Sequence, residues 1–369
     1  MKRTFFSFLL TSGVLFLFSQ SGYSYPEYSA FSGSNCMACH TGPVGGFGRK
    51  PLNIDSPGYI TDKVSVSGNL QFLLLSDQRE GSDDRVVLFP MEGALHVAWK
   101  LYPTLTLVGS QDFGFLREAY GMLHNESESM YLRIGFFTLP YGLLFADHTS
   151  FIKEGRVEAG QTTFEERGLG AGLFGARYKD SGMELGLSGR WFINLAFTSG
   201  VIGQEERAFP SSQGGNKKSF TRRAGFITNN FSLGASVYNN DNEVADRRIL
   251  RYGGFGWIKA GPFALLFEHD EGEDEKFTVS GSTQSRASYL ELVWGFPFPV
   301  KKWTSYLKTR WEQLDPNRSL ENDRLQRWVY SYRFNPMAYL SFEAFYRQNK
   351  EEPIEKNNDD ILFLTHIFF

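Results

Sequence analysis

The sequence predicts an all-β fold, a transmembrane antiparallel β-barrel of about 16 strands with a short segment in front of it. From about residue 62 onward, apolar and polar side chains alternate with a period of two, as in strands with two unlike faces. The connections between these expected strands alternate between short and long. The chain also contains 35 Phe, 17 Tyr and 7 Trp, which a barrel can expose to lipid, whereas a soluble fold would have to bury most of them.

The N-terminus has the features of a secretory signal peptide. Lys2 and Arg3 precede an apolar stretch from Phe5 to Phe18, and small and polar residues follow up to Ser24. We expect cleavage after Ser24, because the apolar stretch is too short to span a bilayer comfortably as a helix. An uncleaved N-terminal anchor is the alternative.

The expected organisation has three parts: a signal peptide at 1–24, a short segment at 25–61 and the barrel at 62–369. Without Lys2 and Arg3 the mature chain carries 36 basic and 41 acidic residues, a net charge of −5. A nucleic-acid partner is therefore not expected, since it would need a concentrated positive surface. No later segment offers a long uncharged apolar run, so no transmembrane helix is expected either.

Three stretches show the alternation most clearly, namely 64–74, 303–312 and 338–347. In each of them aromatic and aliphatic side chains occupy one face, and polar or charged side chains occupy the other. A membrane barrel turns the apolar face to lipid and the polar face to a wet lumen. A periplasmic sheet with its polar face in solvent is the alternative. The apolar ending Ile367-Phe368-Phe369 favours the barrel, because it resembles the signal by which barrels are assembled into the outer membrane.

The expected connections also favour the membrane barrel, since short turns on one side and long loops on the other are typical of outer-membrane proteins. Short turns are expected at Tyr102-Pro103, 179–182, Asn229-Asn230, 260–262 and Asn335-Pro336. Longer polar loops are expected at 199–219, 240–249, 271–285, 314–324 and 349–358. An even number of strands places both ends of the barrel on the periplasmic side.

The longest outer connection in the first half of the barrel runs from Leu139 to Thr163 and contains Pro140, Tyr141 and Gly142. A loop at this point either folds into the lumen and narrows it or stays an ordinary exposed loop. The sequence leaves both possibilities open.

The segment 25–61 contains Cys36-Met37-Ala38-Cys39-His40, which is the attachment motif of c-type haem. Two thiols separated by two residues can both bond to one edge of a porphyrin, and the adjacent His40 supplies the proximal axial nitrogen. The alternative is a plain Cys-x-x-Cys disulfide followed by a chance histidine. A zinc site would need more ligands close by. One motif predicts one covalent haem c, and the segment is accordingly expected to be a monohaem cytochrome c segment that needs shielding by the barrel.

The second axial ligand of such a haem must come from elsewhere in the chain. His96 is expected to point inward, because Leu95 and Val97 take the lipid face, and is the first candidate. His366 points inward by the same parity and is the second candidate. His148, in the long outer loop, is the third. The metal ligands are thus expected to be His40 and His96, although a histidine in a lumen is more often only a polar wall residue.

The arrangement resembles the fused monohaem cytochrome–porins best known from iron-oxidising bacteria. The matching features are Cys36, Cys39 and His40 shortly after a signal peptide, a glycine-rich stretch that ends in Phe47-Gly48-Arg49, and a barrel that fills the rest of the chain. The resemblance implies electron transfer across the outer membrane, between an extracellular donor and a periplasmic electron-carrier cytochrome. Extracellular ferrous iron is one donor that it implies, in which case the protein would act as an iron(II) oxidase.

Three functions remain open on the sequence. The first is the electron conduit. The second is a diffusion porin with a docked structural haem, and the third is a haem sensor with an open axial position. Acidic residues expected in the outer loops, at 83–84, 270–275 and 359–360, would suit iron cations. They would equally suit the ordinary role of charged outer loops in contact with lipopolysaccharide.

Overall fold

The computed structural model describes most of the barrel region. The described residues are 61, 63–77, 85–112, 115–143, 179–200, 218–242, 247–276, 282–297, 304–315, 317–320, 324–337, 339–351 and 359–368. The signal peptide, the segment with Cys36, Cys39 and His40, and His148 lie outside them. Among the described residues, no helix is long and apolar enough to cross a membrane.

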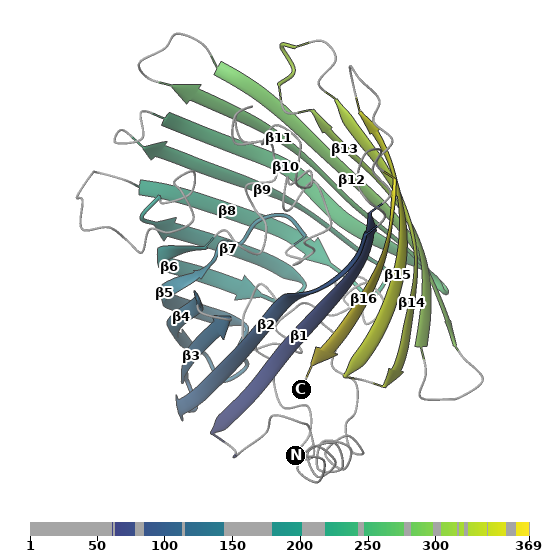
Figure 1. Ribbon diagram of the computed structural model, residues 1–369. Coiled ribbons are helices and arrows are strands. Elements are labelled where there is room, and N and C mark those ends of the chain that lie inside the picture. The colour runs from purple at the N-terminus through teal and green to yellow at the C-terminus, as the bar shows by residue number, and fades with distance from the viewer. Residues whose placement is uncertain are drawn as a thin grey trace.

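Sixteen strands of the described chain close into one antiparallel barrel (Figure 1). Each strand pairs with its neighbours in sequence, and β1 pairs with β16 to close the ring. The strands are β1 Val64–Asp77, β2 Arg85–Tyr102, β3 Leu105–Asp112, β4 Phe115–His124, β5 Met130–Thr138, β6 Lys179–Ser188, β7 Trp191–Thr198, β8 Lys218–Ile227, β9 Phe231–Asn242, β10 Arg247–Ala260, β11 Phe263–Lys276, β12 Ser282–Pro297, β13 Thr304–Asp315, β14 Leu325–Met337, β15 Leu340–Glu351 and β16 Asp360–Phe368. The predicted fold class is confirmed.

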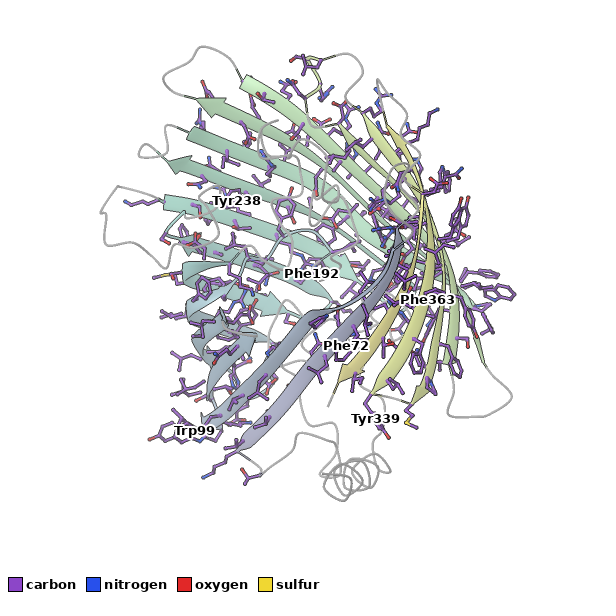
Figure 2. The ribbon with its side chains drawn as sticks, in the orientation of Figure 1. Phe72, Trp99, Phe192, Tyr238, Tyr339 and Phe363 are labelled. Carbon is purple, nitrogen blue, oxygen red and sulfur yellow. The ribbon has the colours of Figure 1, made fainter. Side chains whose placement is uncertain are left out.

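The two faces of the strands differ as the alternation predicts. In β2, Leu95 and Trp99 are each 48% exposed on the outer face, whereas His96 between them is only 3% exposed. Figure 2 shows Trp99 and Phe363 on the outside of the barrel. Aliphatic and aromatic side chains are exposed on the outside of every part of the wall. Such a surface is stable only in contact with lipid, which places the barrel in the bacterial outer membrane.

Most of the connections alternate in length around the barrel, with the two-residue link from β3 to β4 at the outer end as an exception. Links of two or three residues join β2 to β3, β6 to β7, β8 to β9, β10 to β11 and β14 to β15. The longest connections, 139–178 and 199–217, lie at the opposite end. Because the number of strands is even, β1 begins and β16 ends at the end with the short turns, the periplasmic end.

Two of the expected turns are wrong. Residues 179–182 lie inside β6, where Gly182 pairs with Gly135 on one side and Thr198 on the other. A side chain at Gly182 would overlap the backbone of β7, so this glycine serves close strand packing instead of a turn. Asn335-Pro336 lies within β14, at an irregularity in its pairing with β15, as expected for a proline that cannot donate a ladder hydrogen bond.

The acidic run 270–275 is not an outer loop. These residues belong to β11, which continues to Lys276, and they alternate between its two faces. Asp270 and Asp274 are buried inside the barrel, while Glu275 is exposed on the outside. Asp360 is also turned inward, where it pairs with Arg347. The acidic side chains that the sequence assigned to one outer surface are therefore divided between the lumen and the exterior.

Candidate functional site: a constriction in the lumen

The first five residues after β5, Leu139 to Leu143, turn into the barrel; we call them the strap. Leu139, Tyr141 and Leu143 are all buried, and Tyr141 is only 1% exposed. Gly142 has a φ of 60°, a left-handed conformation that glycine adopts without strain and that reverses the chain here. Of the two possibilities that the sequence left open for this loop, its described part therefore takes the inward one.

Three hydrogen bonds attach the strap to strands further round the wall. The backbone N–H of Gly142 donates to Ser236 Oγ of β9 at 3.0 Å. The backbone N–H of Leu143 donates to Glu268 Oε2 of β11 at 3.1 Å. The Tyr141 hydroxyl donates to Asp270 Oδ1, also of β11, at 3.1 Å. A segment that leaves the wall at β5 is thus bonded to strands four and six positions further round the barrel.

Arg223 of β8 provides a fourth attachment. Its Nε donates to the carbonyl oxygen of Gly142 at 2.8 Å, and its Nη1 donates to Asn194 Oδ1 at 3.2 Å. The guanidinium lies over two aromatic rings, 4.3 Å from the centroid of Phe192 and 4.7 Å from that of Phe255. Figure 2 places Phe192 inside the barrel. Hydrogen bonding and the cation–π contacts together fix the guanidinium beneath the strap.

Two glycines make room for these rings. Gly225 of β8 and Gly234 of β9 are directly paired in the sheet. A Cβ at Gly225 would overlap the ring of Phe192, and a Cβ at Gly234 would meet the ring of Phe255. An aromatic ring that covers a glycine in a strand recovers packing that the glycine lacks. The local sequence Arg223-Ala224-Gly225 therefore supplies the guanidinium and, at Gly225, the space for the ring of Phe192 on which the guanidinium lies.

A buried ion pair fixes the end of β5, where the strap begins. Arg133 of β5 and Glu184 of β6 are both fully buried, and Arg133 Nε donates to Glu184 Oε2 at 2.7 Å. Arg133 Nη2 also donates to the carbonyl oxygen of Thr138 at 2.8 Å, the last residue of β5. The guanidinium stacks on Phe137, 4.1 Å from its centroid. The chain therefore leaves β5 from a fixed position.

The opposite wall, β12 to β16, carries a network of cations and carboxylates. Glu343 accepts hydrogen bonds from Arg333 Nε at 2.6 Å and from Ser331 Oγ at 2.8 Å, and it lies 3.2 Å from Lys308 Nζ. The buried cations here are Lys308, Arg310, Arg327, Arg333 and Arg347. The buried carboxylates are Glu291, Glu312, Asp315, Glu343 and Asp360.

The lumen is less uniformly polar than the alternation predicted. An apolar cluster, which includes Phe255, Trp257, Leu266, Tyr289 and Val293, faces inward from β10 to β12. These side chains belong to the periplasmic half of the strands. The strap is attached to β11, which belongs to the same part of the wall. The polar groups that bind the strap therefore lie beside an apolar inner surface.

The structure places both of the candidate haem ligands that it describes inside the barrel. His96 and His366 are 3% and 4% exposed. On β1, Ser67 pairs with His96 and Gln71 pairs with His366, so a single strand separates the two histidines, as predicted. Within the described part of the chain, no group of three or more His, Cys, Asp or Glu side chains is arranged to hold a metal ion.

Sequence reasoning missed the residues that fix the strap, namely Arg133, Glu184, Arg223 and Glu268. The alternation along each strand identifies these residues as inward-facing charges. It does not indicate that Arg133 pairs with Glu184, or that Arg223 and Glu268 bind the strap. Leu143 and Glu268 are 125 positions apart in the chain.

The sequence matches no known protein-family profile, and no curated protein matches it. Solved structures do match the fold. The anion-selective porin of Comamonas acidovorans aligns with a TM-score of 0.61 and 9% identity, over 83% of this chain and 99% of that one. OmpT of Vibrio cholerae aligns with a TM-score of 0.55 and 11% identity, over 84% and 98%. The channel DcaP of Acinetobacter baumannii aligns with a TM-score of 0.52 and 11% identity, over 83% and 97%. At these identities the likeness concerns the fold, which is that of the outer-membrane porins.

Proposed function

We propose that the protein is a diffusion porin of the outer membrane, a channel whose lumen is narrowed by the strap. The observation that carries this proposal is the attachment of Leu139–Leu143 to Ser236, Glu268, Asp270 and Arg223. A segment held across the lumen by four hydrogen bonds sets a fixed passage, which is what selective diffusion requires. Fold likeness to outer-membrane proteins that include a porin and a channel supports the same function by analogy.

The test is conductance in a planar lipid bilayer. The full mature chain, isolated from outer membranes in detergent, is expected to insert and to give discrete current steps of uniform size in 1 M KCl. Uniform steps follow from a constriction that is fixed by hydrogen bonds. Barrels that insert, as judged by protease protection, but carry no current would contradict the proposal.

A second function, electron transfer across the outer membrane, is favoured by the motif Cys36-Met37-Ala38-Cys39-His40. A bound haem c would supply one-electron exchange. In this proposal Cys36 and Cys39 hold the cofactor covalently, His40 is its proximal ligand, and electrons pass between an extracellular donor, such as ferrous iron, and a periplasmic cytochrome. The motif lies outside the described residues, so the proposal rests on the sequence.

The described residues fit such a group in one respect. Lys63, just before β1, is bonded to β2, because the backbone N–H of Lys100 donates to its carbonyl oxygen at 2.7 Å. The chain from the motif therefore joins the barrel only four residues along β2 from His96, which is buried and turned inward. A neutral imidazole at this place is a suitable axial ligand. His366 is the second choice, and His148 remains a candidate outside the described residues.

Visible spectroscopy of the purified protein tests this second function. The wild type is expected to show a c-type spectrum, and the double variant C36S/C39S is expected to lose the covalent haem entirely. Replacing His96 by Ala should then change the low-spin spectrum, whereas H124A should not, because the ring of His124 is already bonded to Thr106 Oγ1 at 3.1 Å on the inner wall of β4.

The electron donor separates the two functions. Reduction of the haem by added ferrous iron would support the conduit. Reduction by dithionite but not by ferrous iron would contradict iron oxidation and leave a diffusion porin with a structural haem. If the wild type carries no covalent haem, the electron-transfer proposal is wrong, while the porin proposal is unaffected.

A further inference from the structure

The buried charges of the lumen are distributed unevenly around the barrel. On β12 to β16 the buried ionisable side chains that the structure describes balance, with five cations and five carboxylates. Their ion pairs span that wall, as between Arg347 and Asp360 or between Arg333 and Glu343. With histidine counted as neutral, this side of the lumen therefore contributes no net charge.

The side that holds the strap does not balance. Among the described side chains of β5 to β11, the buried cations are Arg133 and Arg251. The buried carboxylates on the same strands are Asp180, Glu184, Glu268, Asp270 and Asp274. The carboxylates exceed the cations by three, which gives a net charge of −3. Ion pairs between these groups do not change the net charge, because both partners of a pair stay in the lumen.

Half-buried groups change this result only slightly. Among the described side chains on the inner face, Arg223 and Lys259 add two positive charges to this side, and Glu118 of the adjoining β4 adds one negative charge, so these groups together leave a net charge of −2. The outer connections that follow β5 and β7 carry little net charge, since residues 144–178 contain five acidic and four basic residues and residues 201–217 contain two of each.

The negative wall coincides with the constriction. Glu268 and Asp270 are the two carboxylates that accept hydrogen bonds from the strap. The field of these carboxylates therefore acts on a permeating ion at the strap, where protein walls leave less water to screen the ion's charge.

We infer that this channel selects for small cations over anions, and that Glu268 and Asp270 at the strap determine the selectivity. The inference rests on the proposed porin function and names its substrate class. It also separates this chain from one of its fold neighbours, which is described as an anion-selective porin. Two net charges acting at about 10 Å through water favour K⁺ over Cl⁻ by about threefold or more at low salt.

The test is the reversal potential of the channel across a tenfold KCl gradient. We expect the sign that corresponds to preferential K⁺ permeation, with a permeability ratio of about three at 0.1 M salt that falls toward one at 1 M, because salt screens the charges. The double variant E268Q/D270N is expected to bring the ratio close to one at all salt concentrations. Gln and Asn keep an oxygen acceptor for Leu143 N–H and the Tyr141 hydroxyl, so the variant removes the two charges while the hydrogen bonds to the strap can still form.

The matched control is E273Q/E275Q, which removes two carboxylates from the outer face of the same strand. It should leave the permeability ratio unchanged. Anion preference in the wild type would overturn the inference, and so would a ratio that is equally insensitive to both double variants. Absence of any channel current, in contrast, would reject the porin function on which the inference rests.

Discussion

Replacing Arg133 by Met is expected to lower the free energy of unfolding of the barrel by about 3 to 5 kcal/mol, the usual effect of removing one partner from a buried ion pair. Arg133 and Glu184 are both 0% exposed, so the variant leaves the carboxylate of Glu184 buried without its cation. The Tyr131 hydroxyl and the Asn194 amide still donate to Glu184, but neutral donors compensate a charge only in part. The measurement is equilibrium unfolding in urea from lipid vesicles, followed by tryptophan fluorescence.

Two variants make this result specific. The double variant R133M/E184M removes both charges together and is expected to be more stable than R133M alone, because no uncompensated charge is left in the wall. The matched control is R248M, since Arg248 pairs with Glu275 at 3.8 Å with the two side chains 53% and 47% exposed. Loss of that pair should cost about 1 kcal/mol or less. Equal effects of R133M and R248M would show that water reaches Arg133.

The architecture of the barrel was accessible from the sequence because it depends on local alternation. Each strand repeats the same two-residue pattern, so the inward position of His96 and His366 could be read from their apolar neighbours. The prediction of turns was wrong where one residue type occurs for two different structural reasons. Gly182 resembles a turn residue, but its lack of a side chain allows close packing between β6 and β7.

The constriction could not be predicted, because its contacts join distant parts of the chain. The sequence places Tyr141 and Gly142 in a long loop, but their hydrogen-bond partners lie on β8, β9 and β11. Arg223 is 81 residues from Gly142, and no local pattern relates the two. The inward direction of the strap depends on the register of three strands at once, which only the closed barrel defines.

Arg223 is the residue on which the position of the strap should depend most strongly. Replacement by Ala removes a charged hydrogen bond to the carbonyl oxygen of Gly142, which is usually worth about 1.5 to 3 kcal/mol. Such a loss raises the population of the detached strap by about tenfold to a hundredfold. Bilayer recordings of R223A are therefore expected to show long openings to a larger conductance, which the wild type visits only briefly.

Amide hydrogen exchange gives a second readout that does not depend on conduction. The N–H groups of Gly142 and Leu143 donate to Ser236 and Glu268, so their exchange in R223A should accelerate by the same factor. The control is R222A, which removes the neighbouring arginine on the outer face, where it stacks on Phe220 at 4.2 Å. Acceleration in both variants would point to general loosening of β8. Acceleration in R223A alone would show that one inward guanidinium, stacked on Phe192 and Phe255, holds the strap against the wall.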